Sequence, residues 1–440
     1  MTFTTTGPGP DFSAFSKATE LKKRIWFTLF ALIVYRTGTY IPIPGIDPVA
    51  LGAMFQQHQG GILGMFDMFS GGALKRMTIF ALSVMPYITA SIIVQLLSAI
   101  LPSFEALKKE GEQGRMKLNQ YSRYLTVLFA VVQSYGISIG LENTQGGSAV
   151  IVNAAFFRIS TMATLTGGTI FLMWLGEQIT ARGIGNGTSL IIYSGIVANL
   201  PHAIAQTLEQ GRVGALSTWF ILCIMVLVVG VLATCVFFER AQRRILVQYP
   251  KRQVGNRASE AQTNHMPLKI NTSGVIPPIF ASSLLLMPLS ILSFTDVSQK
   301  GGILSDIVAS LQHGKPLFMI MYATLIVFFA FFYTSVQFNP VDVADNLKKY
   351  GGFVPGIRPG KNTADYFDYV LTRLTVLGAA YLATICLVPE FLMSRGAIPF
   401  YLGGTSLLIV VSVTIDTLQK IQTHLYAHQY QGLIKKMPRK

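Results

Sequence analysis

The sequence is poor in charge. Only 12% of its 440 residues are Asp, Glu, Lys or Arg, about half the share in a typical soluble globular protein. Hydrophobic residues make up 51%, and the mean hydropathy is +0.48. Long apolar segments with few charges exclude an ordinary soluble domain and predict a chain that crosses a membrane many times.

Cysteine is also scarce, and the three cysteines form no disulfide or metal-binding pattern. Cys223, Cys235 and Cys386 all fall inside apolar segments, which fits a lipid-buried or reducing environment. Residues 1–24 contain no apolar h-region and no small-residue cleavage site, so we expect no cleaved signal peptide.

Motifs of nucleotide and metal chemistry are absent from the sequence. It has no G-x-x-x-x-G-K-[ST] loop, no H-E-x-x-H or paired-cysteine metal motif, and no G-x-S-x-G elbow in a hydrolase context. The glycine-rich stretch at 183–189 does not follow a strand pattern, so it does not predict dinucleotide binding. We therefore expect no enzyme, no cofactor and no metal.

Ten apolar segments are candidate membrane spans. Their centres lie near residues 33, 88, 131, 165, 197, 228, 284, 326, 382 and 409. Ten spans place both termini on one side, and 27 of the 35 Lys and Arg residues lie on that side, against six on the other. The positive-inside rule makes the basic side cytoplasmic.

Ten spans divide into five plus five near residue 210. A duplicated unit with an odd number of spans must insert its second copy upside down, and the two copies then enclose an interface at mid-membrane. We predict an all-α fold with two inverted five-helix halves. The predicted segments are a cytoplasmic N-terminus at 1–24, an N-terminal half at 25–209, a C-terminal half at 210–418 and a cytoplasmic tail at 419–440.

Two cytoplasmic loops are longer and more basic than membrane orientation requires. Residues 239–273 carry seven Lys or Arg, and residues 338–373 carry five. Within the second loop, YGGFVPGIRPG at 350–360 holds two prolines and four glycines, which predicts a structured turn. A shaped basic projection favours docking to a large acidic partner, either a nucleic acid or an acidic protein face.

A shorter apolar segment, GGILGMFDMFSGG at 60–72, stands between the first two spans. A helix of this length rises about 20 Å, whereas a bilayer core is about 30 Å thick. It is either a re-entrant segment surrounded by protein or an interfacial helix on the outer leaflet. The flanking glycines, such as Gly71 and Gly72, are expected to let it hinge.

No acidic residue stands out near the middle of a predicted span. Ion-coupled carriers hold ionisable groups near the bilayer midplane. Here Glu177, Glu239, Glu390 and Asp416 all fall near predicted span ends. This disfavours a small-solute secondary transporter, which stays open as the alternative to a channel.

Several long motifs, in order along nearly the whole chain, resemble one family. IFALSVMPYITASIIVQLL at 79–97 and WLGEQITARGIGNGTSLII at 174–192 are similar to the two signature segments of SecY, the channel subunit of the bacterial protein-export translocon. Residues 101–126, 339–375 and 399–413 resemble further regions of the same family. The resemblance implies a central pore that moves unfolded secretory polypeptides across the cytoplasmic (inner) membrane and releases membrane segments sideways into the bilayer.

The resemblance implies that the short segment, at about 60–74, is a plug that folds back from the outer side and closes the resting pore. The plug residues are Ile62, Leu63, Met65, Phe66, Asp67, Met68 and Phe69.

The resemblance also implies a pore ring, a set of branched apolar side chains that keeps a narrow constriction dewetted. The matching positions are Val84, Ile88, Thr188, Ile192, Ile279 and Ile409. The family usually has an aliphatic residue at the position of Thr188. Either the ring is less dry here, or the hydroxyl bonds to its own helix and presents its methyl. Ser83 replaces a usual glycine, and we expect this change to affect helix packing.

The second and seventh spans are implied to form the two sides of a lateral gate. The implied gate residues are Pro86, Gln95, Gln133, Asn271 and Pro277. The prolines are expected to weaken local helix hydrogen bonding and permit bending. The three polar residues are expected to make contacts across the closed gate.

The two basic loops are implied to receive the motor ATPase SecA and the ribosome, including its RNA. The docking residues are Arg358, Lys348, Lys349, Arg243, Arg244, Lys251, Arg252 and Arg257. Among them, Arg358 matches the arginine that serves SecA in the family. The other implied partners are small membrane subunits similar to SecE and SecG, signal peptides, nascent polypeptides and membrane lipid.

Overall fold

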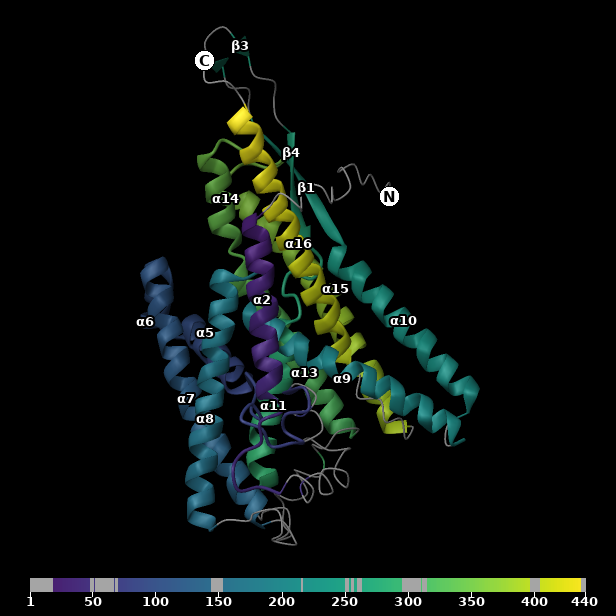
Figure 1. Ribbon diagram of the computed structural model, residues 1–440. Coiled ribbons are helices and arrows are strands. Elements are labelled where there is room, and N and C mark those ends of the chain that lie inside the picture. The colour runs from purple at the N-terminus through teal and green to yellow at the C-terminus, as the bar shows by residue number, and fades with distance from the viewer. Residues whose placement is uncertain are drawn as a thin grey trace.

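The computed structural model describes residues 19–47, 51, 67, 70–143, 153–214, 217–249, 253–254, 257–258, 263–294, 310, 315–395 and 404–436. In this part of the chain, ten long helices follow one another in the order of the ten predicted spans (Figure 1). They are α2 (Thr19–Gly38), α5 (Met85–Ile100), α7 (Glu112–Asn143), α8 (Ala154–Arg182), α9 (Gly187–Arg212), α10 (Thr218–Arg240), α11 (Ile276–Phe294), α13 (Pro316–Gln337), α15 (Lys361–Arg395) and α16 (Gly404–Lys436).

Seven of these helices are long and apolar enough to cross a membrane: α7, α8, α9, α10, α13, α15 and α16. An eighth span is formed by α5 if it is counted together with α6 (Pro102–Lys109), which follows it after a bend of 98°. The helix α2 carries charged residues at both ends, and the apolar stretch Ile276–Leu285 of α11 is shorter than a span. The chain is therefore a helical protein with many membrane spans.

The two halves share one packing scheme. In the N-terminal half α5 contacts α7, α7 contacts α8, α8 contacts α9, and α2 lies against α8 and α9. In the C-terminal half α11 contacts α13, α13 contacts α15, α15 contacts α16, and α10 lies against α15 and α16. Each helix thus meets the same neighbours as its counterpart five helices later, which is the arrangement expected of a duplicated five-helix unit.

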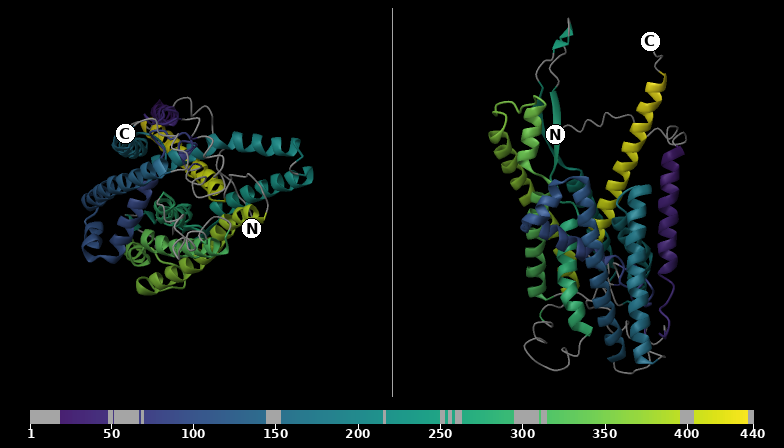
Figure 2. Two further views of the ribbon diagram at one scale, coloured as in Figure 1. Left: turned by 90° about the horizontal axis from the view of Figure 1, so that it is seen from below. Right: turned by 90° about the vertical axis from the view of Figure 1, so that its left-hand side faces the viewer.

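The halves meet along two lines. On one side α11 contacts α5 and α7, and on the other α9 contacts α10 and α16. Figure 2 shows the blue helices of the first half beside the green helices of the second, with α9 and α10 extending away from both. The main hydrophobic core lies between the halves and includes buried side chains from both.

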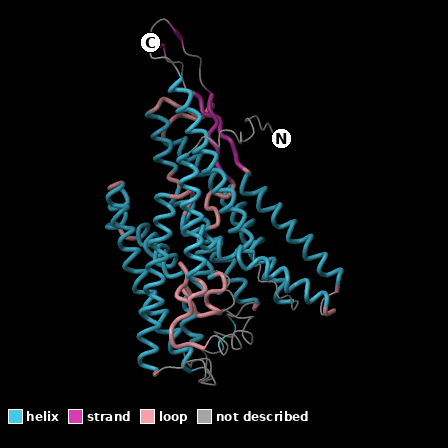
Figure 3. Tube along the Cα trace, in the orientation of Figure 1, coloured by secondary structure: helices cyan, strands magenta, loops and turns pink. Residues whose placement is uncertain are grey.

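The described strands project from the same end of the helices as the C-terminal end of α16 (Figures 1 and 3). β1 (Gln242–Gln248) pairs antiparallel with β4 (Thr263–Lys269), and the short strands β2 (Gln253–Val254) and β3 (Arg257–Ala258) pair with each other. We call the β1–β4 ribbon the hairpin. The described loops between α2 and α5 lie at the opposite end of the helices (Figure 3).

Candidate functional site

Five of the six predicted ring residues lie in one buried cluster. Val84, Ile88, Ile192, Ile279 and Ile409 belong to the same hydrophobic core, with exposed fractions between 1% and 8%. The four isoleucines lie on α5, α9, α11 and α16, each within two turns of the point where its helix begins, and Val84 directly precedes α5. Branched apolar side chains from both halves thus belong to one buried hydrophobic core.

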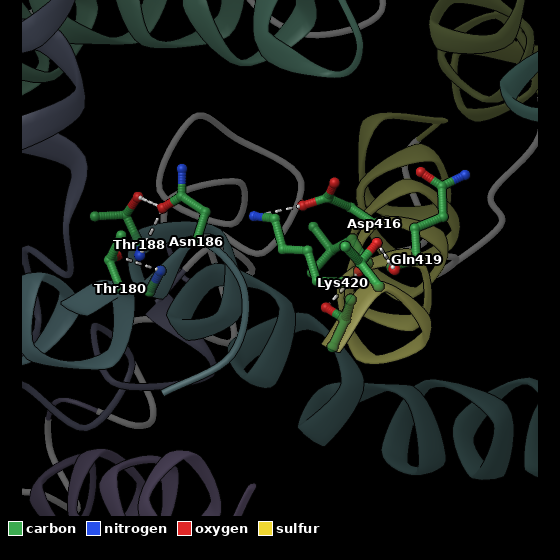
Figure 4. Close-up of polar contacts among 10 residues, drawn as sticks. Thr180, Asn186, Thr188, Asp416, Gln419 and Lys420 are labelled. Carbon is green, nitrogen blue, oxygen red and sulfur yellow. Dashed lines mark hydrogen bonds and ion pairs between the residues drawn. The ribbon is translucent and has the colours of Figure 1, made fainter. Parts of the chain in front are cut away.

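Thr188, the sixth predicted ring residue, is half-buried and makes polar contacts at the start of α9 (Figure 4). Its Oγ1 donates to Oδ1 of Asn186 at 2.7 Å, and its backbone N–H donates to the same oxygen at 3.2 Å, so Asn186 caps the start of α9. A Cβ placed on Gly176 of α8 would lie 3.2 Å from the Thr188 methyl. The hydroxyl is therefore satisfied at the start of its own helix, and the methyl packs toward α8.

Two of the acidic residues near the span ends, Glu177 and Asp416, contact cationic side chains. Arg123 of α7 holds Glu177 of α8 through Nε–Oε1 and Nη2–Oε2 contacts of 2.9 and 2.7 Å. Asp416 pairs with Lys420 one turn along α16 at 3.1 Å (Figure 4). Such paired charges are structural and leave no unpaired group for ion coupling at these two sites.

A second interhelical ion pair joins α7 and α8 at the far ends of the two helices. Arg158 Nε donates to Oε2 of Glu142 at 2.9 Å, and Arg158 Nη2 contacts the same carboxylate. The sequence analysis identified neither interhelical ion pair. The signal was present, because an arginine precedes a glutamate by 19 residues on each helix, Arg123 and Glu142 on α7, and Arg158 and Glu177 on α8. Antiparallel packing of two such helices brings each arginine opposite a glutamate.

The two predicted sides of the gate lie against each other. Ser283 Oγ of α11 donates to Met85 Sδ of α5 at 3.9 Å, and both residues are buried. Helix α11 also contacts α7, on which Gln133 is buried, while Gln95 on α5 is half-buried. The second and seventh spans are therefore in contact in this structure.

The prolines do not weaken these helices in the way we expected. Helix α5 begins at Met85 and α11 begins at Ile276, so Pro86 and Pro277 both fall in a first helical turn. The backbone N–H groups of a first turn have no partner within the helix, so proline removes no helical hydrogen bond there. The prolines start the two gate helices instead of kinking them.

Asn271 does not reach across the gate, which corrects our expectation for this residue. Its Nδ2 donates to Oε1 of Glu239 at 2.8 Å and to the Gly274 carbonyl at 3.1 Å. Both partners belong to the C-terminal half. The sequence could not show this, because Asn271 precedes α11 by five residues and its partner lies 32 residues earlier in the chain.

Of the predicted plug residues, the structure describes Asp67. The others, Ile62, Leu63, Met65, Phe66, Met68 and Phe69, lie outside the described residues. Asp67 Oδ1 accepts a hydrogen bond from the Lys75 N–H at 2.8 Å. Burial raises the pKa of the Asp67 carboxyl, and the nearby Lys75 partly offsets this effect.

The residues that follow, 70–78, form a turn fixed to α2 and α9, which we call the anchored turn. The Tyr35 hydroxyl donates to the Ser70 carbonyl and Arg36 Nη1 donates to the Gly71 carbonyl, each at 3.2 Å. A Cβ on Gly71 would lie 2.8 Å from the Gly195 Cα of α9. With φ of +69°, Gly71 is thus required by both space and backbone conformation, and it is a packed contact where we expected a free hinge.

Ser83 has an unusual backbone conformation. Its φ is +52°, in the left-handed region, and the residue is buried just before α5. Glycine adopts this conformation without strain, whereas residues with a Cβ do so at an energetic cost. The departure from the family's glycine therefore bears on backbone strain, where we had expected an effect on helix packing.

The two predicted docking loops form one structural unit. Gln248 of β1 and Phe353 exchange two backbone hydrogen bonds of 2.9 Å each, which joins the 350–360 turn to the hairpin. Beneath them a separate hydrophobic core contains Ile245, Leu268 and Phe367, among other side chains. We call the hairpin together with this turn the docking platform. The sequence analysis predicted neither the contact between the two loops nor the strands. In the structure Ile245 and Val247 are buried, and Leu246 between them is exposed.

The basic residues of the platform that are described lie on its surface. Arg243, Arg244, Lys348, Lys349 and Arg358 are exposed. The turn that carries Arg358 is ordered by backbone hydrogen bonds and by Thr363 Oγ1, which donates to the Arg358 carbonyl at 2.9 Å. Of the other predicted docking residues, Arg257 lies on β3, and Lys251 and Arg252 lie outside the described residues.

No candidate metal site is found within the described ranges, in which no three His, Cys, Asp or Glu residues come together. The three cysteines are free, with Cys235 and Cys386 buried and Cys223 exposed.

Comparison with known proteins places these features in one family. The family described as SecY matches residues 78–418. A protein translocase subunit SecY of Rickettsia conorii is 55% identical over 431 residues, covering 98% of this chain and 99% of the relative. The Escherichia coli K12 protein of the same name is 53% identical over 431 residues, covering 98% and 97%.

Solved structures share the fold. One described as a protein conducting channel aligns with a TM-score of 0.66 at 17% identity and covers 96% of this chain and 95% of its own. Canine Sec61, in a ribosome-channel complex from the endoplasmic reticulum, aligns with a TM-score of 0.64 at 17% identity and the same coverage.

Proposed function

The chain belongs to the SecY family, and on that premise we propose that its apolar ring is the point at which a polypeptide crosses the membrane. The chain is a protein-conducting channel subunit of a membrane translocase and not an enzyme. A small-solute transporter is not favoured, because the curated relatives are translocase subunits. The observation that carries the proposal is the burial of five ring residues from both halves in one cluster.

The ring suits a substrate of any sequence. A collar of branched aliphatic side chains excludes water from a narrow constriction and so blocks ions in the resting state. The same side chains present no fixed hydrogen-bonding group to a passing chain. A polypeptide can therefore pass whatever its side chains are, provided that it is unfolded.

The segment at about 60–74 is proposed to be the plug. The anchored turn overlaps the end of this segment at residues 70–74 and supports this assignment. Its bonds to Tyr35 and Arg36 of α2, and the contact of Gly71 with Gly195 of α9, keep that end of the segment beside a ring helix. Deletion of residues 62–70 is expected to leave a leaky channel, measured as ion conductance in planar bilayers. Unchanged conductance of the deletion variant would contradict the assignment.

The contact between α5 and α11 is proposed to be the closed lateral gate. Separation of the two helices at Met85 and Ser283 would connect the ring to lipid between them. This is the route by which signal peptides and membrane segments leave the pore. The N-terminal half at 25–209 and the C-terminal half at 210–418 are proposed to move apart along this line.

The chain works with other translocon components and with the ribosome. We assign the docking platform to the motor ATPase SecA and to the ribosome, and we expect SecE-like and SecG-like subunits beside the spans. Exchange of Arg358 for Glu is expected to impair motor-driven export while leaving insertion and stability intact. Normal secretion in that variant would count against the assignment.

The chain resides in a membrane. We propose that this is the bacterial cytoplasmic membrane and that both termini and the docking platform face the cytoplasm. The excess of Lys and Arg on that side of the sequence supports this orientation.

A photo-crosslinking residue at Ile192 tests the central proposal. With a secretory precursor stalled midway through export, we expect crosslinks to the precursor that disappear when it is absent. A matched probe at Phe30 of α2, which is 65% exposed on the outside of the helices, is expected to meet no precursor. If Ile192 meets only lipid or neighbouring helices, the ring assignment fails and the transporter alternative returns.

A further inference from the structure

A buried polar cluster lies where the hairpin joins the membrane helices. Glu239 is 7% exposed and Asn271 is 3% exposed. Asn271 Nδ2 donates to Glu239 Oε1 at 2.8 Å, and Ser273 Oγ donates to Asn271 Oδ1 at 3.2 Å. We call these three residues the hairpin foot. Neither the ring, the gate contact nor the exposed docking surface uses them.

The hairpin foot ties together the two strands of chain that enter and leave the hairpin. Glu239 is the second-last residue of α10, and Asn271 comes two residues after β4 ends. Between them the Ile270 N–H donates to the Ala241 carbonyl at 3.1 Å, next to the first strand pair, Gln242 with Lys269. The backbone hydrogen bonds between the two strands are therefore followed directly by the buried side-chain bond between Asn271 and Glu239.

The foot is also packed against the rest of the C-terminal half. A Cβ on Gly378 of α15 would lie 3.0 Å from the Ile270 carbonyl oxygen. The Ser412 hydroxyl of α16 lies beside the Glu239 carboxylate. A carboxylate in such a place needs its hydrogen bonds, because burial of an unpaired charged or polar group is strongly unfavourable.

The segment after the foot leads directly to the gate and the ring. Asn271 Nδ2 also donates to the Gly274 carbonyl at 3.1 Å, and Gly274 has φ of +64°, so the connection to α11 is a tight turn. Ile279, a ring residue, and Ser283, which contacts α5, follow in the first two turns of α11. A displacement at the foot is thus passed to both through eight to twelve residues of ordered chain.

We propose that Glu239 and Asn271 are positioning residues that couple a partner bound to the hairpin to the movement of α11. The inference rests on the proposed docking function of the platform. A partner that pushes or tilts the hairpin moves both chain segments at its base together, because the bond between Glu239 and Asn271 joins them. The displacement is then passed on to α11. Without the bond, the hairpin tilts on its own and α11 stays against α5.

Isosteric variants test the bond without creating a cavity. Asn271→Asp places a second carboxylate opposite Glu239 and removes the donor, so we expect it to uncouple. Glu239→Gln keeps an accepting oxygen for Asn271 and is expected to behave like the wild type. The double variant Glu239→Gln, Asn271→Asp rebuilds the bond with the roles exchanged and is expected to recover.

The readouts separate coupling from docking and from folding. Channels in lipid nanodiscs are mixed with ribosomes that carry a stalled secretory chain. Ribosome affinity is measured first, and gate opening is then measured as loss of fluorescence transfer between dyes on exposed positions of α5 and α11, Ile100 and Leu284. For Asn271→Asp we expect an affinity within twofold of wild type, at least a tenfold smaller opening signal, and recovery in the double variant.

Three results are decisive. Opening in Asn271→Asp at the wild-type level would overturn the coupling inference while leaving docking intact. Loss of opening in the double variant as well would assign the foot a merely structural role and also overturn it. If the wild-type channel does not bind ribosomes, the proposed docking function itself fails, and that result is distinct from both.

Discussion

The anchored turn and the docking platform are two non-helical regions of the described chain, and they are held in different ways. The platform has its own hydrophobic core, in which Phe367 of α15 is fully buried with Ile245 and Leu268 of the hairpin. The anchored turn also buries apolar side chains, Leu74 and Met77. In addition, side chains of α2 bond its backbone carbonyls, and Gly71 makes a close contact with α9.

The difference matches what each region has to do. Apolar burial is non-directional and adds up over many contacts, so the platform keeps its shape while a large partner pulls on it. Hydrogen bonds and close backbone contacts are directional, so they add one defined position to the apolar packing of the anchored turn. The anchored turn is therefore fixed in place relative to α2 and α9.

The largest effect is expected from removing the centre of the platform core. Phe367→Ala deletes a fully buried ring and is expected to lower the free energy of unfolding by about 3–5 kcal/mol. Ribosome binding should fall with it, while the resting ion conductance stays at the wild-type level. Thermal unfolding in detergent and planar-bilayer recordings measure the two effects.

Leu377→Ala is the matched control for this variant, because Leu377 lies on the same helix but is 57% exposed. We expect it to change the unfolding temperature by much less. A leak in Phe367→Ala channels would show that the two regions are not independent and would break the comparison.

The next effect concerns the contact between the anchored turn and α9. Gly71→Ala brings a Cβ to 2.8 Å from the Gly195 Cα and adds a left-handed strain of about 1–2 kcal/mol. We expect about a tenfold higher resting conductance and unchanged ribosome affinity. Gly136→Ala on α7 is the control, because nothing lies within 4 Å of the added Cβ. Equal conductance of the two variants would contradict a packed role for Gly71.

Relief of strain is expected to act in the opposite direction. Ser83→Gly removes the cost of a φ of +52° and should stabilise the protein by about 0.5–1 kcal/mol, seen as a higher unfolding temperature. Ser91→Gly, in the middle of α5, should instead destabilise it by about 1 kcal/mol. A lower unfolding temperature for Ser83→Gly would mean that the hydroxyl contributes more than the backbone strain costs.

The smallest effect is a dependence of the resting seal on pH. Burial raises the pKa of Asp67, so its neutral form favours the packed position. That contribution is fully present below the usual aspartate pKa and is lost as the pH rises through the raised value. Resting conductance should therefore rise by less than about tenfold over this interval in the wild type. Asp67→Asn should be flat over the same interval, and a persisting dependence in that variant would assign the titration to another group.

The positions of the helices could be predicted from the sequence because every span is an apolar run bounded by charge. The break before α5 could not, because residues 79–84 are as apolar as the helix that follows. Met77 and Ser83 adopt a positive φ although they are not glycine, and nothing in the sequence around them predicts this conformation. Tertiary contacts impose that conformation on them.

The ring positions came from the family motifs, and the structure adds which of them lie together. The motif did not predict the orientation of the Thr188 side chain. Its hydroxyl donates a hydrogen bond to Asn186, and its methyl faces α8. The partner of Asn271 lies on another helix, so no local pattern in the sequence points to Glu239. The hairpin was not predicted, because RRILVQ has three consecutive apolar residues and no strict alternation of polar and apolar side chains.

The two ion pairs between α7 and α8 have a consequence for the lipid around the protein. Arg123 and Glu142 are 19 residues apart on α7, as are Arg158 and Glu177 on α8. That interval of helix measures about 28 Å, close to the roughly 30 Å of a bilayer's hydrocarbon layer. The pairs therefore mark the two levels at which charge meets water, and they give this helix pair a fixed hydrophobic length. The ion pairs fix the register of α7 against α8. A bilayer of another thickness must therefore thin or thicken locally, or the two helices must tilt. The spacing of the two ion pairs thus sets the membrane thickness that α7 and α8 match without tilting.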